Sequence, residues 1–150
     1  MTFKGAVEVT PHLGAVAFHK GIQALAPADR DRIECATARN LSGSVNLDAT
    51  LRPHLPNANR WDYAVGYRRG TDTVFWIEVH PASQGAVSEV QNKFNWLTGW
   101  LASDGKALRS LEARFVWISS GKTTFTPGSP AIRRLAQQGV QTVGRVLRLS

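Results

Sequence analysis

Residues 61–79 carry the pattern that most limits how this chain can fold. Over residues 61–68 bulky side chains alternate with small or polar ones, which predicts a strand with one bulky and one sparse face. Residues 69–72 predict a turn. The apolar, β-branched and aromatic run over residues 73–79 then predicts a central strand that is buried on both faces and stops before Pro81. The chain should therefore form a hairpin of two neighbouring strands.

A long helix and a further strand should follow this hairpin. Apolar residues recur at three- and four-residue spacings over residues 88–101, and Ser88 with Gln91 matches a capping box at the helix start. Residues 104–105 should end the helix, and residues 114–119 predict another buried strand. A strand joined through a helix to a further strand predicts a parallel, right-handed crossover in a mixed sheet.

The N-terminal part of the chain has a weaker pattern. Residues 14–25 predict a helix, and residues 30–51 fit either a strand or one face of a helix. Strands are the preferred interpretation, with a turn at residues 40–43 and a second strand at residues 44–51. Residues 53–60 contain two prolines and two asparagines and should form a loop.

The C-terminal residues complete an α/β pattern. Ser129 and Pro130 mark the start of a short helix and Gly139 marks its end, and alternation over residues 140–149 predicts a final strand. With 150 residues, of which 43% are hydrophobic and 19% charged, the chain has the size and composition of one globular domain. We expect a single α/β domain over residues 1–150, with a mixed β-sheet and flanking helices.

The sequence also bears on location. No apolar stretch reaches the roughly 20 residues that span a bilayer, and the first five residues lack the apolar core of a signal peptide. Cys35 is the one cysteine, so it has no partner for an internal disulfide, and it should be a small buried hydrophobe. We expect a cytoplasmic protein without membrane contact.

Basic residues outnumber acidic ones. Eighteen Lys and Arg against 11 Asp and Glu give a formal net charge of +7, which favours a polyanionic partner, most commonly nucleic acid. A soluble protein that is merely basic is the alternative. Residues 120–123 imitate the end of a P-loop, but Val116 stands where that motif requires glycine, so we expect only a basic loop able to touch phosphates. The candidate nucleic-acid contacts are Arg68, Arg69, Lys122, Arg133 and Arg134.

Glu78 stands at the end of the predicted buried strand, where an unpaired charge costs several kcal/mol. His80 shares its face, and Asp62 lies on the sparse face of the preceding strand. An odd number of loop residues would place Asp62 opposite Glu78, whereas an even number would separate them. Two close carboxylates repel each other, and Mg²⁺ would relieve this repulsion by binding oxygens of both, together with waters and the carbonyl of Val79.

These residues resemble a known motif. An aspartate that opens one hairpin strand (residues 61–63), a glutamate at the end of the next (residues 77–80) and a helix crossing to a further strand are similar to the PD-(D/E)xK nuclease superfamily. The resemblance covers residues 44–119, about half of the chain, and implies a restriction-endonuclease-like core. It further implies that Asp62 and Glu78 bind Mg²⁺ and that His80 replaces the motif lysine, which helps to orient the attacking water.

The replacement of lysine by His80 bears on catalysis. Histidine is largely neutral at pH 7 and can act as a base or a metal ligand, whereas lysine carries a permanent charge. Lys93, on the following helix, offers a cation from another direction. An ordinary pair between Glu89 and Lys93, four residues apart on that helix, is the preferred interpretation.

Three hypotheses about function follow. The first is a Mg²⁺-dependent phosphodiesterase acting on DNA, in which Asp62 and Glu78 hold the metal and His80 positions or deprotonates the nucleophile. The second is a non-catalytic module on the same scaffold that binds nucleic acid or protein through its basic surface. The third is a homodimer formed through the tryptophan-rich helix, since Trp96 and Trp100 are better explained as core or dimer contacts than as a base-stacking platform.

Overall fold

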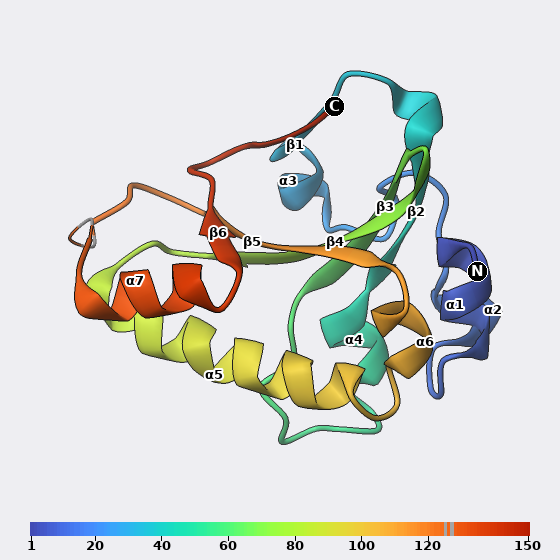
Figure 1. The fold of residues 1–150 in the computed structure, drawn as a ribbon, viewed down its shortest axis with the longest axis horizontal. Coiled ribbons are helices and arrows are strands. Elements are labelled where there is room, and N and C mark those ends of the chain that lie inside the picture. Colours follow the sequence, from blue (N-terminus) through green and yellow to red (C-terminus); the bar gives the residue numbers. More distant parts are fainter. Residues whose placement is uncertain (125, 127) are drawn as a thin grey trace.

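The computed structural model describes residues 1–124, 126 and 128–150 (Figure 1). Short elements occupy the N-terminal part: α1 (Phe3–Val9), α2 (Gly14–Ala17), α3 (Pro27–Arg30), β1 (Ile33–Cys35), the 3₁₀ helix η1 (Ala38–Asn40), β2 (Leu41–Asn46) and α4 (Leu47–Leu51). The elements that follow are β3 (Tyr63–Arg69), β4 (Thr71–His80), α5 (Gln84–Leu101), α6 (Lys106–Arg109), β5 (Glu112–Ser119), α7 (Pro130–Gln137), β6 (Val140–Thr142) and β7 (Leu147–Leu149).

A five-stranded mixed sheet forms the centre of the fold, with the strand order β2-β3-β4-β5-β6. Strands β2, β3 and β4 pair in antiparallel fashion, whereas β4, β5 and β6 pair in parallel. The parallel neighbours β4 and β5 are joined through α5, as the strand–helix–strand pattern predicts. Strands β1 and β7 form a separate, parallel two-stranded sheet. The predicted α/β class, a mixed sheet with flanking helices, is confirmed.

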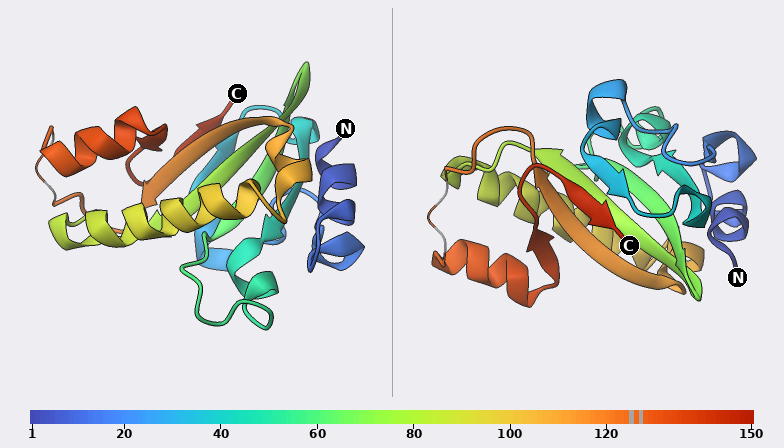
Figure 2. Two further views of the ribbon diagram at one scale, coloured as in Figure 1. Left: turned by 60° about the horizontal axis from the view of Figure 1, so that its bottom comes forward. Right: turned by 90° about the horizontal axis from the view of Figure 1, so that it is seen from above.

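Two apolar clusters lie on the two faces of the large sheet. Helix α5 runs along one face (Figure 2), where Trp76 and Trp117 of the sheet share a cluster with Trp100 of the helix. The opposite face carries Phe75, which shares the other cluster with Leu147 of β7. Successive strand residues point to opposite faces, so the neighbours Phe75 and Trp76 belong to different clusters. Trp100 is buried, with its ring edge-on to that of Trp76 at 6.2 Å, as expected for a core residue.

The hairpin of β3 and β4 has an odd-numbered connection. Its register pairs Tyr63 with Ile77 and Arg69 with Thr71, which leaves Gly70 alone at the turn. Gly70 has a φ of 81°, a left-handed conformation that glycine adopts without strain. Extending the register by one residue places residue 62 opposite residue 78. The condition that the sequence sets for the two acids is therefore met.

The predicted helix over residues 14–25 is wrong, because α2 ends at Ala17. Gly21 has a φ of 52°, which a right-handed helix does not accommodate. His19 instead exchanges backbone hydrogen bonds of 3.0 and 2.8 Å with Ser44 of β2. A tertiary contact with the sheet edge therefore replaces the local helix.

The predicted turn at residues 40–43 and strand at residues 44–51 are displaced along the chain. Strand β2 already begins at Leu41 and the chain becomes helical at Leu47. The side chain of Asn46 accepts a hydrogen bond from the N–H of Ala49 and caps α4. The strand at β1 and the loop over residues 53–60 are confirmed.

Two later elements also differ from the prediction. Helix α5 begins at Gln84 rather than at Ser88, because Ser83 caps it by accepting a hydrogen bond of 3.2 Å from the N–H of Ala86. The predicted final strand is divided into β6 and β7, since Gly144, with a φ of 80°, turns the chain from the large sheet to the small one. Helix α7, which begins after Ser129, is confirmed.

Helix α5 has 18 residues and alternates buried and exposed positions along its length. Within the described residues, no helix combines the length and the apolar character needed to cross a bilayer.

Candidate active site

Asp62 is held in place from both its backbone and its side chain. It directly precedes β3, and its carbonyl accepts hydrogen bonds of 2.9 and 3.2 Å from the N–H groups of Leu47 and Asp48 at the start of α4. Its Oδ2 accepts a hydrogen bond of 3.0 Å from the N–H of Val79 in β4. The carboxylate is thus fixed at the end of the hairpin opposite to the turn.

Glu78 is fully buried on the face of the sheet that α5 covers. Its Oε2 accepts a hydrogen bond from Nζ of Lys93, and the same Nζ lies 3.2 Å from Oδ1 of Asp62. Three residues from three different elements therefore meet at one point. Oε1 of Glu78 is buried and has no hydrogen-bond partner among the described residues.

The preferred pairing of Glu89 with Lys93 is wrong. Lys93 turns inward to the two acids, and Glu89 instead accepts a hydrogen bond of 2.8 Å from Nε2 of His80. Lys93 lies three residues after Val90 and four before Leu97, which are both fully buried, so it belongs to the inward-facing stripe of α5. A lysine within an apolar stripe was the signal in the sequence that could have revealed this contact.

His80 joins the same cluster, as the sequence predicts. Its Nδ1 lies 3.5 Å from Oε2 of Glu78 and its Nε2 lies 2.8 Å from Oε2 of Glu89. The hydrogen bond with Glu78 is the largest influence on its pKa, which rises although burial and the charge of Lys93 oppose the change. Both ring nitrogens of His80 therefore face carboxylates, and the ring links Glu78 with Glu89.

The charges in the cluster alter one another. Burial, followed by the negative charge of Glu78, raises the pKa of Asp62 from 3.8 to about 6, although Lys93 and the N–H of Val79 oppose the change. Burial alone would lower the pKa of Lys93, but the charges of Glu78 and Asp62 outweigh it and raise that pKa. Lys93 is therefore cationic at neutral pH, while Asp62 takes up a proton readily in mild acid.

The donor set fits a hard divalent cation. Two carboxylates meet at Lys93, and Oε1 of Glu78 is buried without a hydrogen-bond partner among the described residues. Burial and, after it, the charge of Glu78 raise the pKa of Asp62. Mg²⁺ is commonly bound by one or two carboxylates together with waters and substrate phosphates, so two are sufficient. Across residues 1–124, 126 and 128–150, no three His, Cys, Asp or Glu side chains are grouped to hold a metal by themselves. The remaining ligands would have to be waters, a substrate oxygen or the expected carbonyl of Val79.

Some of the candidate nucleic-acid contacts lie at the same end of the sheet as this cluster. Lys122 is exposed in the loop after β5, close to where the N–H of Ser120 donates to the carbonyl of His80 at 3.2 Å. Helix α7, which carries Arg133 and Arg134 on its exposed side, lies beside the first turns of α5 (Figure 1). Gln138 follows α7 and bonds to Gln91 of α5 at 2.8 Å.

Arg68 and Arg69 lie elsewhere. They are the last two residues of β3, whereas Asp62 directly precedes its first residue, so the length of the strand, about 20 Å, separates them from Asp62. The structure therefore does not bring these two arginines together with the acidic cluster.

The chain was compared with protein-family models, with curated proteins and with solved structures, and no match was found in any of the three.

Proposed function

We propose that this protein is a Mg²⁺-dependent phosphodiesterase that acts on DNA and has a PD-(D/E)xK-like core. The observation that supports the proposal is the meeting of Asp62, Glu78 and Lys93 from the start of β3, the end of β4 and the middle of α5. The element order β3-β4-α5-β5 also agrees with that core. A cytoplasmic location, where both DNA and Mg²⁺ are present, belongs to the same proposal.

Lys93, rather than His80, would supply the cation of the motif. Its ammonium group reaches both carboxylates from the helix, offsets part of their negative charge and leaves one N–H donor that can orient a water. Asp62 and Glu78 would hold Mg²⁺, which when bound lowers the pKa of water and steadies charge on the phosphate. His80 is then a positioning residue, because it fixes Glu78 while Glu89 fixes its ring.

The test is Mg²⁺-dependent nicking of supercoiled plasmid. We expect activity in the unaltered protein and a loss of about 100-fold or more in Asp62→Ala, Glu78→Ala and Lys93→Met. Lys106→Met is the matched control, because Lys106 is exposed on α6 and its substitution removes the same charge away from the acidic cluster. Circular dichroism and thermal unfolding establish that each variant is folded.

Two results would contradict the proposal. The unaltered protein could be folded yet inert on plasmid, linear duplex and single-stranded DNA with either Mg²⁺ or Mn²⁺. Alternatively, Lys93→Met could retain the activity of Lys106→Met, which would remove Lys93 from the site.

A non-catalytic nucleic-acid-binding module is the second candidate. The close contact of Lys93 with both acids favours it, because this ion-paired triad satisfies much of the carboxylate charge without a metal. This function predicts DNA binding that is unchanged by EDTA and by Glu78→Gln. Binding that strengthens on addition of Mg²⁺ and loses this response in Glu78→Gln would favour the phosphodiesterase instead.

A further inference from the structure

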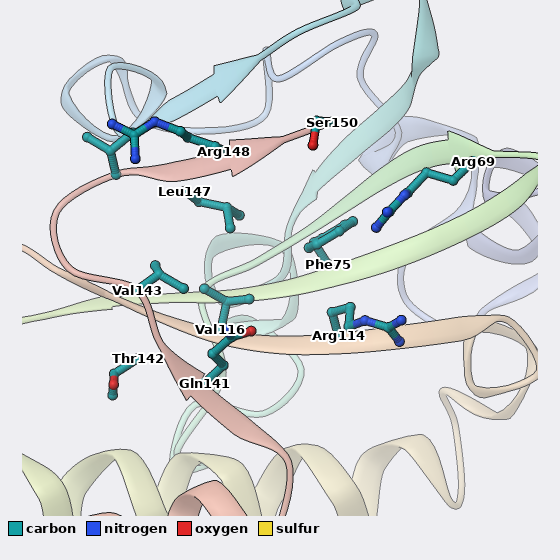
Figure 3. Close-up of a pocket in the computed structure, with 11 residues that line it drawn as sticks. Arg69, Phe75, Arg114, Val116, Gln141, Thr142, Val143, Leu147, Arg148 and Ser150 are labelled. Atoms are coloured by element: carbon teal, nitrogen blue, oxygen red, sulfur yellow. The ribbon is translucent and has the colours of Figure 1, made fainter.

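A groove of about 430 Å³ lies on the face of the sheet that α5 does not cover. Figure 3 shows it between the large sheet and the C-terminal segment that leads into β7. Its main side chains are Arg69 of β3, Phe75 of β4, Arg114 and Val116 of β5, Gln141 of β6 and Arg148 of β7. Phe75 and Glu78 are three positions apart on β4 and therefore point to opposite faces, so the groove is separate from the acidic cluster.

The groove is strongly basic. Three arginines line it, and no Asp or Glu is among the described residues that form its wall. Arg69 has no ion pair or hydrogen bond through its side chain within the described part of the chain. Its guanidinium points toward Phe75 (Figure 3). Charge that the protein does not neutralise at a concave site attracts an anion.

The other two arginines are paired only at the surface. Arg114 lies 3.0 Å from Glu112, and Arg148 lies 3.0 Å from Glu34. The side chains of both pairs are at least half exposed, with exposed fractions of 50% and 52% in the first and 76% and 58% in the second. Such pairs contribute little to stability and exchange partners readily, so both guanidinium groups can turn to a ligand.

The floor of the groove is apolar, with Phe75 its most exposed member at 8%. Phe75 and Val116 come from the neighbouring strands β4 and β5, and Leu147 of β7 closes the floor on the other side. Gln141 and Thr142 are exposed at one end and can donate and accept hydrogen bonds. An aromatic ring could rest on this floor with its polar edge at Gln141 and an attached phosphate at the arginines.

We propose that this groove binds a nucleotide, with the phosphate held by Arg69 and Arg114 and the base placed on the floor around Phe75. A guanidinium group can donate two parallel hydrogen bonds to the oxygens of one phosphate. The volume of the groove is in the range of sites for small ligands. The nucleotide is either free or one unit of a single strand, since both present the same phosphate and base. The site does not depend on the proposed phosphodiesterase activity.

The test is titration by calorimetry and by NMR with AMP, adenosine, inorganic phosphate and a single-stranded oligonucleotide of about 12 bases. We expect saturable binding of AMP, tighter than that of adenosine or phosphate alone, with shifts at the Gln141 side chain. Arg69→Ala with Arg114→Ala should lower the affinity for AMP by about tenfold or more, because two charge-assisted contacts are lost. Arg52→Ala with Arg109→Ala, which removes two exposed arginines outside the groove, should leave AMP binding unchanged.

The two sources of the nucleotide separate in the same experiment. An oligonucleotide that binds more tightly than AMP and loses affinity in Arg69→Ala with Arg114→Ala identifies a strand, whereas AMP that binds as tightly as the oligonucleotide identifies a free nucleotide. Addition of EDTA should not alter the affinity for AMP, so failure of the active-site proposal leaves this one standing. The proposal is overturned if neither AMP nor the oligonucleotide binds, if phosphate alone binds as tightly as AMP, or if the paired alanine variant binds like the unaltered protein.

Discussion

Asp62 is the residue at which function and stability oppose each other. Its carboxylate is buried near a second negative charge, and its pKa rises to about 6 because ionisation is costly in that place. A residue that served only to fix strand register could be neutral at no loss to the fold. An acid that destabilises the fold at neutral pH is therefore a sign of a functional site.

Asp62→Asn should stabilise the protein at neutral pH. The folded-state pKa of Asp62 lies above its unfolded value, so its contribution to stability falls as the pH rises from about 4 to about 6. The rise of this pKa from 3.8 to about 6 corresponds to an increase of up to about 3 kcal/mol in the free energy of unfolding of Asp62→Asn at pH 7.5. This increase should vanish near pH 4. Urea unfolding at both pH values measures it.

Asp31→Asn is the control for this measurement, because Asp31 is exposed and the substitution removes the same charge. We expect it to change the free energy of unfolding by less than about 0.5 kcal/mol at either pH. An Asp62→Asn variant that is no more stable than Asp31→Asn at pH 7.5 would show that the carboxylate of Asp62 is not strained.

The residues of the site differ in how far the sequence alone could identify them. Strand alternation and an odd number of loop residues are enough to place Asp62, Glu78 and His80 together, and the structure brings all three together. The sequence alone pairs Lys93 with Glu89, because a spacing of four on one helix is visible in the sequence, whereas a contact with another element is not. A fully buried and a partly buried carboxylate together attract a lysine more strongly than one exposed glutamate does, and this tertiary contact decides the outcome.

Helix α5 is the element on which the site depends, since it carries both Lys93 and Glu89. Ser83, five residues after Glu78 along the chain, caps the start of the helix by accepting a hydrogen bond from the N–H of Ala86. The cap therefore sets the position of the first turns of α5 relative to the end of β4. A change at this cap should affect the cluster as well as the helix.

Ser83→Ala should destabilise the protein by about 1 kcal/mol, the usual effect of losing a helix cap. Ser88→Ala is the matched control, because Ser88 is the cap that the sequence pattern indicates but lies exposed inside α5. Its substitution should change the free energy of unfolding by less than about 0.5 kcal/mol. Thermal and urea unfolding of both variants compare the two. Equal effects of the two substitutions would place the start of α5 elsewhere.

Elements were predictable where a periodic pattern extends over many residues. The hairpin and α5 satisfy this condition, whereas β5 is indicated by a short apolar run and α7 by the residues at its two ends; all four are present. The N-terminal elements are short, with Gly21 in a left-handed conformation and His19 bound to the edge of β2. Local sequence cannot reveal such contacts, because the partner residue lies far along the chain.

At the scale of the whole molecule, the net charge of +7 is distributed over separate regions. Lys122, Arg133 and Arg134 lie at the end of the sheet that carries the acidic cluster, whereas Arg68 and Arg69 lie at the hairpin turn about 20 Å away. A duplex whose phosphate enters the proposed active site should contact the first group. The second group should contribute little to duplex binding.

This separation predicts a difference in salt dependence. Each phosphate contact lowers the slope of log affinity against log salt by about 0.9, so Arg133→Ala with Arg134→Ala should make the slope for duplex DNA shallower by about 2. Arg68→Ala with Arg69→Ala removes the same charge from the hairpin and should change that slope by less than about 0.5. Fluorescence anisotropy with a catalytically silent Glu78→Gln background over a series of salt concentrations measures both slopes without cleavage. If the hairpin pair produces the larger change, duplex DNA binds at the far end of the sheet, and the acidic cluster cannot be the centre that reacts with it.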